Sequence, residues 1–238
     1  MKITVVTATL NSAATLADCL SSVASQSWPD VEHWIVDGGS SDDTLEIVRQ
    51  RPLLATTTMS EPDQGIYDAL NKGVSRAEGD IVGFLHADDV YADSTVLARV
   101  AEAFAEDKID AVYGDLQYVA QADATRQIRH WRSSPFDPRA LSWGWMPPHP
   151  TLYVRREWYR RLGGFSLDYS IAADYHFILR LFSQPSFRAA YLPQVLVKMR
   201  IGGVSNGSLR NIVRKSGEDL HALRSTGIGA LGGYGALV

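Results

Sequence analysis

The sequence predicts an α/β fold, in which a mostly parallel central sheet is flanked by helices and extended by antiparallel strands. Two patterns predict it. In the first hundred residues, short β-branched runs alternate with segments whose apolar residues recur at helical spacing. After about residue 110, longer strand-like runs follow one another closely, which indicates antiparallel pairs. Strands joined by helices are usually parallel, so the loops of the first half are expected at one edge of the sheet.

The first half contains four predicted strands, each followed by a predicted helix. The strands span residues 3–8, 33–36, 54–59 and 81–85. The helices are recognised by their apolar residues, which are Leu16, Cys19, Leu20 and Val23; Leu45 and Val48; Ile66, Ala69, Leu70, Gly73 and Val74; and Val96, Leu97, Val100 and Phe104. Ser12 and Asp93 are the expected N-caps of the first and the fourth helix.

The second half is expected to build a second pocket. Its predicted elements are antiparallel strands over 111–119 and 126–132, the interrupting segment SWGWMPPHP, a helix over 171–182, a strand over 187–199 and a helix over 209–223. The predicted organisation is one domain over 1–204, with a nucleotide-binding half of about 1–115 and an acceptor half of about 116–204, then a C-terminal helix over 205–226 and a flexible Gly-rich tail over 227–238.

The composition is that of a packed globular protein. The chain has 238 residues and a formal net charge of -4, so we expect neither a basic nucleic-acid-binding protein nor an acidic disordered tail. Cys19 is its only cysteine, which excludes an intramolecular disulfide and fits a reducing compartment. The first residues do not resemble a signal peptide, and no run approaches the roughly 20 apolar residues that span a bilayer. We expect a soluble cytoplasmic protein, held at most at the inner face of the membrane.

Acidic residues follow three of the predicted strands. Asp88 and Asp89 come just after the fourth strand, Asp37 ends the second, and Asp63 follows the third. Adjacent carboxylates repel each other unless a cation lies nearby, so Asp88 and Asp89 favour a Mg²⁺ or Mn²⁺ site shared with substrate phosphates. The alternatives are that these two are solvated turn residues, and that Asp37 and Asp63 satisfy backbone donors of their own loops. Together the three strand ends favour a nucleotide site.

Two common nucleotide-binding motifs are absent. The first strand leads into TATLNSAAT instead of the GxGxxG of dinucleotide-binding proteins, which argues against a dehydrogenase. The chain also has no GxxxxGK[ST] segment, which excludes an ordinary P-loop phosphotransferase.

Five segments, in this order, resemble glycosyltransferase family 2, the inverting enzymes with a GT-A fold. They are VVTATLNSAATLADCLSSVASQSW, WIVDGGSSDDT, EPDQGIYDALNKG, GFLHADD and AADYHFILRL, and they cover about residues 1–200. The segments DQGIYDALNKG and HPTLYVRREWYRRLGGF are most similar to bacterial transferases of exopolysaccharide or colanic-acid assembly. The resemblance implies a Rossmann-like sheet with an antiparallel extension on the acceptor side, a UDP- or GDP-linked sugar donor, and Mn²⁺ or Mg²⁺ as cofactor.

The resemblance also implies a role for each matched residue. The implied donor-binding residues are Thr7 and Asn11 at the nucleotide loop, Asp37 at the base, Asp63 and Asn71 in the same pocket, and Asp88 at the ribose or the sugar. Asp89 would bind the metal, although the order His-Ala-Asp-Asp leaves open which of the two acids is the direct ligand. Asp174 would be the general base. The simpler alternative for Asp174 is an acid that the helix dipole favours in a first turn.

Two residues of the segment SWGWMPPHP are candidates for the acceptor side. Trp145 offers a flat apolar face of the kind that packs against sugar rings. Because Trp143 and Trp145 alternate as on a strand, at least one of them is expected in the core. His149 precedes Pro150 and would either orient a phosphate or bond a loop carbonyl.

A small basic stripe on the last predicted helix contains Arg210, Arg214 and Lys215. It is either a solvated face or a peripheral contact with a membrane, since acceptors in polysaccharide assembly are often lipid-linked. The sequence leaves open whether the chain forms a homo-oligomer.

These features predict a metal-dependent inverting glycosyltransferase of hexosyltransferase type, acting on a nucleotide sugar and a carbohydrate or lipid-linked acceptor. The cation would stabilise the leaving diphosphate on one face of the sugar, and Asp174 would accept the proton of the acceptor hydroxyl on the other. Two alternatives are a nucleotide-sugar-binding module without transfer and a sugar-phosphate nucleotidyltransferase. The second commonly needs a Gly-rich basic loop after the first strand, which this chain lacks.

Overall fold

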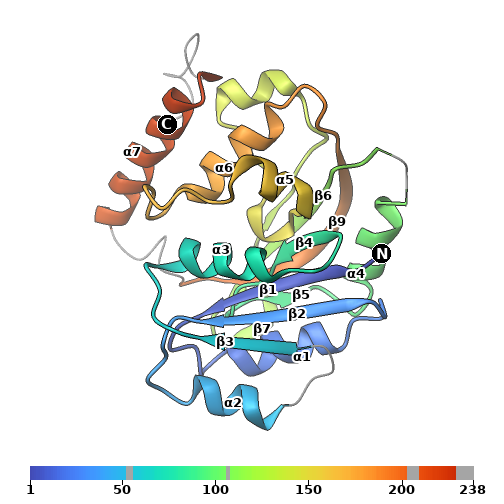
Figure 1. Cartoon of the computed structure of the whole chain (residues 1–238), viewed down its shortest axis with the longest axis vertical. Coiled ribbons are helices and arrows are strands. Elements are labelled where there is room, and N and C mark those ends of the chain that lie inside the picture. The colour runs from blue at the N-terminus through green and yellow to red at the C-terminus, as the bar shows by residue number, and fades with distance from the viewer. Residues whose placement is uncertain (52–55, 106–107, 203–208, 229–238) are drawn as a thin grey trace.

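A computed structural model describes residues 1–51, 56–105, 108–202 and 209–228 (Figure 1). Within these residues, nine strands form one sheet in the order β3-β2-β1-β4-β8-β6-β9-β5, with β7 paired to β6. The strands are β1 Ile3–Thr9, β2 Val31–Asp37, β3 Thr56–Ser60, β4 Ile81–Phe84, β5 Val90–Tyr91, β6 Ala111–Ala120, β7 Asp123–Trp131, β8 Tyr153–Arg155 and β9 Ala189–Arg200. The helices are α1 Leu16–Ala24, α2 Thr44–Gln50, α3 Ile66–Arg76, α4 Val96–Ala103, α5 Arg156–Leu162, α6 Ala173–Phe182 and α7 Leu209–Ser225, with short 3₁₀ helices at Pro138–Trp143 and His149–Thr151.

The four strands of the first half are parallel, as predicted. In the register of β1 with β2, Thr9 lies beside Asp37, and in that of β2 with β3, Asp37 lies beside Ser60. β4 runs parallel to β1 on its other side. The predicted third strand began at residue 54, so its first two residues lie outside the described part of the chain. The loops that follow these strands therefore begin at one edge of the sheet, as expected.

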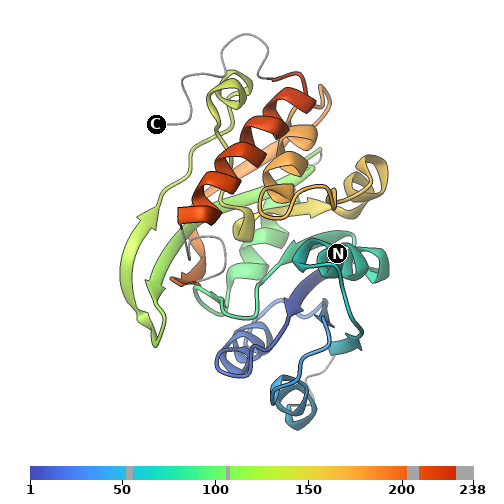
Figure 2. The same ribbon diagram turned by 90° about the vertical axis from the view of Figure 1, so that its left-hand side faces the viewer.

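Helices cover both faces of the sheet because side chains alternate between the faces along each strand. Val6 of β1 packs into the cluster that contains α3, α5 and α6. Val5, the next residue back, packs into the cluster with α1 and α4. Figure 1 shows α3, α5 and α6 on one side of the sheet and α1 and α2 on the other. α7 lies along α6 on the outside of this layer (Figure 2).

The second half contains the predicted antiparallel hairpin, made of β6 and β7, which extends away from the helices (Figure 2). The mixed α/β fold with an antiparallel extension is thus confirmed. Five short elements were not predicted: β5, β8, α5 and the two 3₁₀ helices. β8 lies antiparallel between β4 and β6 and joins the two halves of the sheet. A three-residue strand is too short to give a periodic signal, and only its neighbours make it a strand.

The two predicted helix caps are wrong. Thr15, not Ser12, is the N-cap of α1, and the Ser12 carbonyl accepts from the backbone N–H of Thr15. Thr95, not Asp93, is the N-cap of α4, and Asp93 accepts from the Thr95 N–H at 2.8 Å. Both predicted residues still form the turn that enters the helix.

Gly73 allows α3 to approach β1 closely, and a Cβ at this position would overlap the Val6 side chain. We expect Gly73→Ala to destabilise the protein by about 1–3 kcal/mol, because overpacking outweighs the better helix propensity of Ala. Gly217 of α7 is a matched control, since a Cβ there meets nothing within 4 Å. Gly217→Ala should stabilise the protein by up to about 1 kcal/mol. Urea denaturation checks both, and stabilisation by both variants would contradict the close α3–β1 contact.

Candidate functional site

The acidic turn that follows β4 lies between the two halves of the sheet. Its backbone closes on itself, because the Asp89 N–H donates to the His86 carbonyl at 2.9 Å. Immediately afterwards β5 pairs with β9, so that Val90 lies beside Lys198. The end of a strand from the second half therefore fixes the turn.

Arg200, the last residue of β9, makes the contacts that hold this turn. Its backbone N–H donates to Asp89 Oδ1 at 3.2 Å, and its Nη1 donates to the Asp88 carbonyl at 2.9 Å. Its Nη2 forms an ion pair with Asp18 of α1 at 2.6 Å. Arg200 is only 6% exposed, so one buried cation connects β9, α1 and the acidic turn.

The two acids of the turn have different environments. Asp89 is 1% exposed, and burial raises its pKa well above the ordinary value, with a further contribution from the charge of Asp88. Its Oδ2 is buried and has no hydrogen-bond partner among the described residues. Asp88 is half-buried, and within the described residues no hydrogen bond to its side chain is found. Asp88 is therefore the more accessible carboxylate.

The turn fits a cation that takes most of its ligands from elsewhere. Among the residues that the structure describes, no three His, Cys, Asp or Glu side chains gather closely enough to hold a metal ion. Mg²⁺ and Mn²⁺ in phosphate-transfer sites commonly use one or two carboxylates together with substrate phosphates and water. The accessible side chain of Asp88 matches that donor set, whereas a closed protein cage does not.

Asp37 is fully buried at the end of β2, and its carboxylate holds the loop that follows. It accepts from the backbone N–H of Gly39 at 3.1 Å and of Ser40 at 3.1 Å, and from the hydroxyls of Ser40 and Ser60 at 2.5 and 2.7 Å. These contacts match the alternative in which Asp37 organises its own turn. Both of its oxygens are occupied within the protein, so a base contact by Asp37 stays a prediction without geometric support.

Asp63 and Asn11 lie on the loops next to Asp37. The Asp63 carboxylate packs directly over Gly38, where a Cβ would overlap it, and accepts from the Gly65 N–H at 2.8 Å. Asn11 has a positive φ of 49° and accepts from the Ser41 N–H at 2.9 Å. The loops after β1, β2 and β3 are thus joined to one another, and donor binding by Asn11 and Asp63 stays a prediction.

Thr7 does not lie on the loop that follows β1. It is fully buried in the middle of that strand, and its Oγ1 lies 2.9 Å from His33 Nε2 and 4.0 Å from Cys19 Sγ. The expectation for Thr7 is wrong because β1 continues to Thr9, two residues further. A hydroxyl in the strand interior bonds to its neighbours and has no surface for a ligand.

Asn71 of α3 connects this helix to the segment that precedes α6. Its Nδ2 donates to the Phe165 carbonyl at 2.8 Å, and its Oδ1 accepts from the Phe165 N–H at 2.9 Å. Both ends of the amide are therefore occupied by the backbone of one residue, Phe165. This pairing favours a structural role over the donor contact that the sequence suggested.

Asp174 lies in the first turn of α6, as predicted, with its side chain 23% exposed. Tyr67 of α3 donates to Asp174 Oδ1 at 3.0 Å and also contacts the Ile171 carbonyl at 2.5 Å. Burial raises the pKa of the Asp174 carboxyl above its ordinary value, although the bond from Tyr67 and the charge of Lys215 partly oppose this. Asp174 is thus a partly accessible carboxylate that binds a proton more readily than an ordinary one.

Two histidines lie between Asp174 and the acidic turn. His149 Nδ1 is 3.8 Å from Asp174 Oδ2, and the rings of His149 and His86 are 6.1 Å apart. Burial lowers the pKa of each histidine to about 4, so both are neutral at neutral pH. The contacts from Asp174 to His149, and from His149 to His86 in the acidic turn, place Asp174 near that turn. From the sequence, no role was assigned to Tyr67 or His86, although both belong to segments that resemble the family.

Trp145 packs among aromatic side chains. Its ring centroid lies 5.8, 5.2 and 5.4 Å from those of Tyr113, Phe136 and Phe182. Its Nε1 donates to Ser134 Oγ at 3.3 Å. Trp143 is 67% exposed, so the segment does contain one core and one surface tryptophan. An acceptor contact by Trp145 stays a prediction, and packing accounts for most of its ring.

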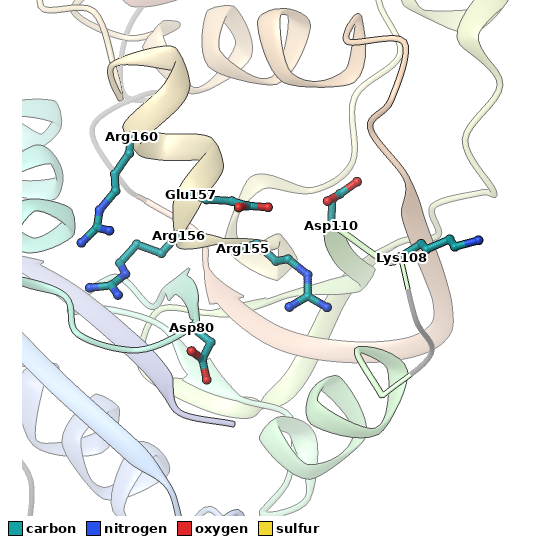
Figure 3. Close-up of a pocket in the computed structure, with 7 residues that line it drawn as sticks. All are labelled: Asp80, Lys108, Asp110, Arg155, Arg156, Glu157 and Arg160. Carbon is teal, nitrogen blue, oxygen red and sulfur yellow. The ribbon is translucent and has the colours of Figure 1, made fainter.

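A cavity of about 470 Å³ lies at the opposite edge of the sheet (Figure 3). Side chains of both charges line it: Asp80, Lys108, Asp110, Arg155, Arg156, Glu157 and Arg160. Asp80 directly precedes β4 and Asp110 directly precedes β6, whereas Asp88 follows β4. The cavity is therefore separate from the acidic turn and from Asp174.

The family model for glycosyl transferase family 2 matches residues 4–184, about three quarters of the chain. The chain belongs to glycosyl transferase family 2. A PGL/p-HBAD biosynthesis glycosyltransferase of Mycobacterium bovis is 36% identical over 203 residues, which cover 83% of this chain and 77% of that protein. An uncharacterised glycosyltransferase of Mycobacterium tuberculosis is 31% identical over 182 residues, which cover 75% of this chain and 68% of that protein. The family and the enzyme class expected from the sequence are confirmed.

Solved structures of glycosyltransferases share the fold of this family 2 member. Staphylococcus aureus TarS, residues 1–349 in complex with UDP-GlcNAc, has a TM-score of 0.76 at 20% identity, with 96% of this chain and 66% of that chain covered. The mannosyltransferase PcManGT of Pyrobaculum calidifontis, in complex with GDP-Man and Mn²⁺, has a TM-score of 0.70 at 24% identity, with 94% of this chain and 63% of that chain covered. The family 2 chain therefore spans slightly less than two thirds of either solved chain, and the predicted GT-A fold is confirmed.

A search of the described helices finds none that combines the length and the apolar character needed to cross a bilayer. The side chain of Arg210 lies outside the described residues. Arg214 and Lys215 form ion pairs with Glu218 and Asp219, at 3.1 and 2.7 Å. Membrane contact by this stripe stays a prediction.

Asn71→Ala should lower the free energy of unfolding by about 2 kcal/mol, because the backbone N–H and the carbonyl of Phe165 both lose their partner. The donor KM should stay unchanged if Asn71 is structural. Asn71→Asp is the control, since it keeps an acceptor for the Phe165 N–H but loses the donor, and should be intermediate. Urea denaturation and donor kinetics check this. A raised donor KM without a loss of stability would support a donor-binding role for Asn71 and contradict the structural role.

Proposed function

We propose that the protein transfers a sugar from a nucleotide-sugar donor to a hydroxyl of a carbohydrate or lipid-linked carbohydrate, with inversion at the anomeric carbon. Asp174 is the general base. The observation that carries the proposal is a partly exposed carboxylate with a raised pKa, 3.8 Å from His149, whose ring lies 6.1 Å from that of His86 in the acidic turn. Perturbed carboxylates in such a position are candidates for proton transfer.

The nature of the donor is inferred from the fold and from the related proteins. TarS and PcManGT, which share the fold, were solved with UDP-GlcNAc and with GDP-Man and Mn²⁺. A UDP- or GDP-linked sugar is therefore the donor class that we propose. A carbohydrate or lipid-linked acceptor is proposed because the mycobacterial relative is named for PGL/p-HBAD biosynthesis.

The proposed chemistry needs Asp174 to be ionised and correctly oriented. The Tyr67 hydroxyl donates to Oδ1 at 3.0 Å, which leaves Oδ2 for the proton of the acceptor hydroxyl. Neutral His149 borders Oδ2 without forming an ion pair that would lower the basicity of the carboxylate. A single displacement by the hydroxyl, from the face opposite the diphosphate, inverts the anomeric centre. The transferred proton remains on Asp174 until it passes to solvent.

We propose Asp88, in place of Asp89, as the direct carboxylate ligand of Mn²⁺ or Mg²⁺. Asp89 is 1% exposed and its Oδ1 is occupied by the Arg200 N–H, whereas Asp88 is accessible. When bound, the cation would offset the charge that develops on the diphosphate. Asp89 then serves chiefly to hold the turn against β9.

Asp174→Asn tests the base. We expect kcat for transfer to fall by about 10²–10⁴-fold, because general base catalysis contributes that much, while calorimetric donor affinity is retained. In the wild type, the rate should fall as the pH drops through the raised pKa of Asp174, so the acidic limb lies above the ordinary carboxyl value of about 3.9. Full transfer activity of Asp174→Asn would reject the proposal. If the wild-type protein binds the donor but transfers no sugar, a binding module is favoured instead.

Asp88→Asn and Asp89→Asn form a matched pair for the cation. Mn²⁺ binding, measured by electron paramagnetic resonance with a nucleoside diphosphate present, should weaken by at least about tenfold in Asp88→Asn. Asp89→Asn should bind Mn²⁺ nearly as the wild type does, because its amide oxygen still accepts from the Arg200 N–H. The reverse order would identify Asp89 as the ligand.

A further inference from the structure

A carboxylate from α7 binds the segment that leads into α6. Glu218 Oε2 accepts from the backbone N–H groups of Ser170, Ile171 and Ala172, at 3.0, 2.8 and 3.0 Å. Its side chain is 15% exposed. Glu218 lies beyond residue 184, where the match to the family model ends, and 46 residues after Ala172.

These three amides belong to the residues just before α6, which begins at Ala173. Ala172 is the N-cap of α6, and no side chain of its own caps the helix. Glu218 therefore binds the residues that lead into the helix, and it does not replace an N-cap side chain, which would accept from the N–H of the second or third helical residue. Its negative charge also lies at the positive end of the helix dipole.

The same peptide segment is held from its other side by Tyr67. The Tyr67 hydroxyl contacts both the Ile171 carbonyl and Asp174 Oδ1. Glu218 binds the N–H of Ile171 and Tyr67 binds its carbonyl, so this residue is fixed by contacts from α7 and α3. Asp174 follows three residues later, in the first turn.

Glu218 is itself well fixed. Arg214, one turn earlier on α7, donates to Glu218 Oε1 at 3.1 Å and contacts the Ser170 hydroxyl at 2.5 Å. Burial opposes ionisation of Glu218, yet the three amides and Arg214 bring its pKa below the ordinary value. Near it, the Tyr169 hydroxyl lies 3.0 Å from His221 Nδ1 and adds a further contact between the segment and α7.

We propose that Glu218 is a positioning residue, which sets the orientation of the Asp174 carboxylate by fixing the backbone of residues 170–172. The proposal rests on the function proposed for Asp174. It makes α7 a working part of the active site, although this helix lies outside the match to the family model. A displacement of the base by about 1 Å can cost on the order of 10²-fold in rate, so loss of this contact should act on kcat.

The test compares Glu218→Ala, Glu218→Gln and Glu218→Asp with Arg224→Gln, an exposed change on the same helix. Glu218→Ala should lower kcat by about 10- to 100-fold with an unchanged donor KM. Amide hydrogen exchange over residues 169–174 should become faster, with no such change at α2. Glu218→Gln should recover part of kcat, because its oxygen still accepts from the amides. Glu218→Asp, with a retracted carboxylate, should recover less, and Arg224→Gln should match the wild type.

The proposal is overturned if Glu218→Ala keeps the wild-type kcat, or if exchange over 169–174 does not change. It is also overturned if kcat falls only in proportion to the folded fraction measured by circular dichroism. If Glu218→Ala does not fold, the order of kcat in Glu218→Gln and Glu218→Asp decides, and equal values would reject the role. Asp174→Asn separates the two proposals, because an inactive Asp174→Asn beside a fully active Glu218→Ala rejects only the positioning role.

Discussion

The arrangement of the site depends on the contacts that the buried Arg200 makes. It contacts Asp18 of α1 and the carbonyl of Asp88, while its backbone N–H binds Asp89. A charged group this deeply buried is tolerated only when paired and hydrogen-bonded, and Asp18 supplies the charge. Because the contacts come from three parts of the chain, the acidic turn takes its place only when β9 has joined the sheet.

Several polar residues that the sequence predicted for the site instead stabilise loops and other backbone segments, which leaves a smaller set facing the site. Asp37 holds the loop after β2, and Asn71 binds the peptide of Phe165. Hydrogen bonds to a buried carboxylate or amide are costly to break, so these residues hold the segments that they bind in place. Asp88 and Asp174 keep accessible carboxylates, and neutral His149 lies next to Asp174 with its ring 6.1 Å from that of His86 in the acidic turn.

The start of α6 shows how distant segments determine one side chain. Tyr67 comes from α3, Glu218 from α7, and both bind the residues that precede Asp174. The family 2 match covers the first of these contacts and ends before the second. A helix that looks like an appendage in the sequence is thus in direct contact with the candidate base segment.

By itself the sequence determined the alternation of strands and helices, the order of the family segments, and the positions of Asp88 and Asp174 at a strand end and in a first helical turn. These features follow from local periodicity, which a single chain carries without its tertiary contacts. Only the tertiary structure decided which acids are occupied. Asp89 meets the Arg200 N–H across 111 positions of sequence, and Glu218 meets Ala172 across 46. Whether a carboxylate can still accept a hydrogen bond from a ligand depends on which donors the fold brings near it. The spacing of residues in the sequence does not predict these distant contacts.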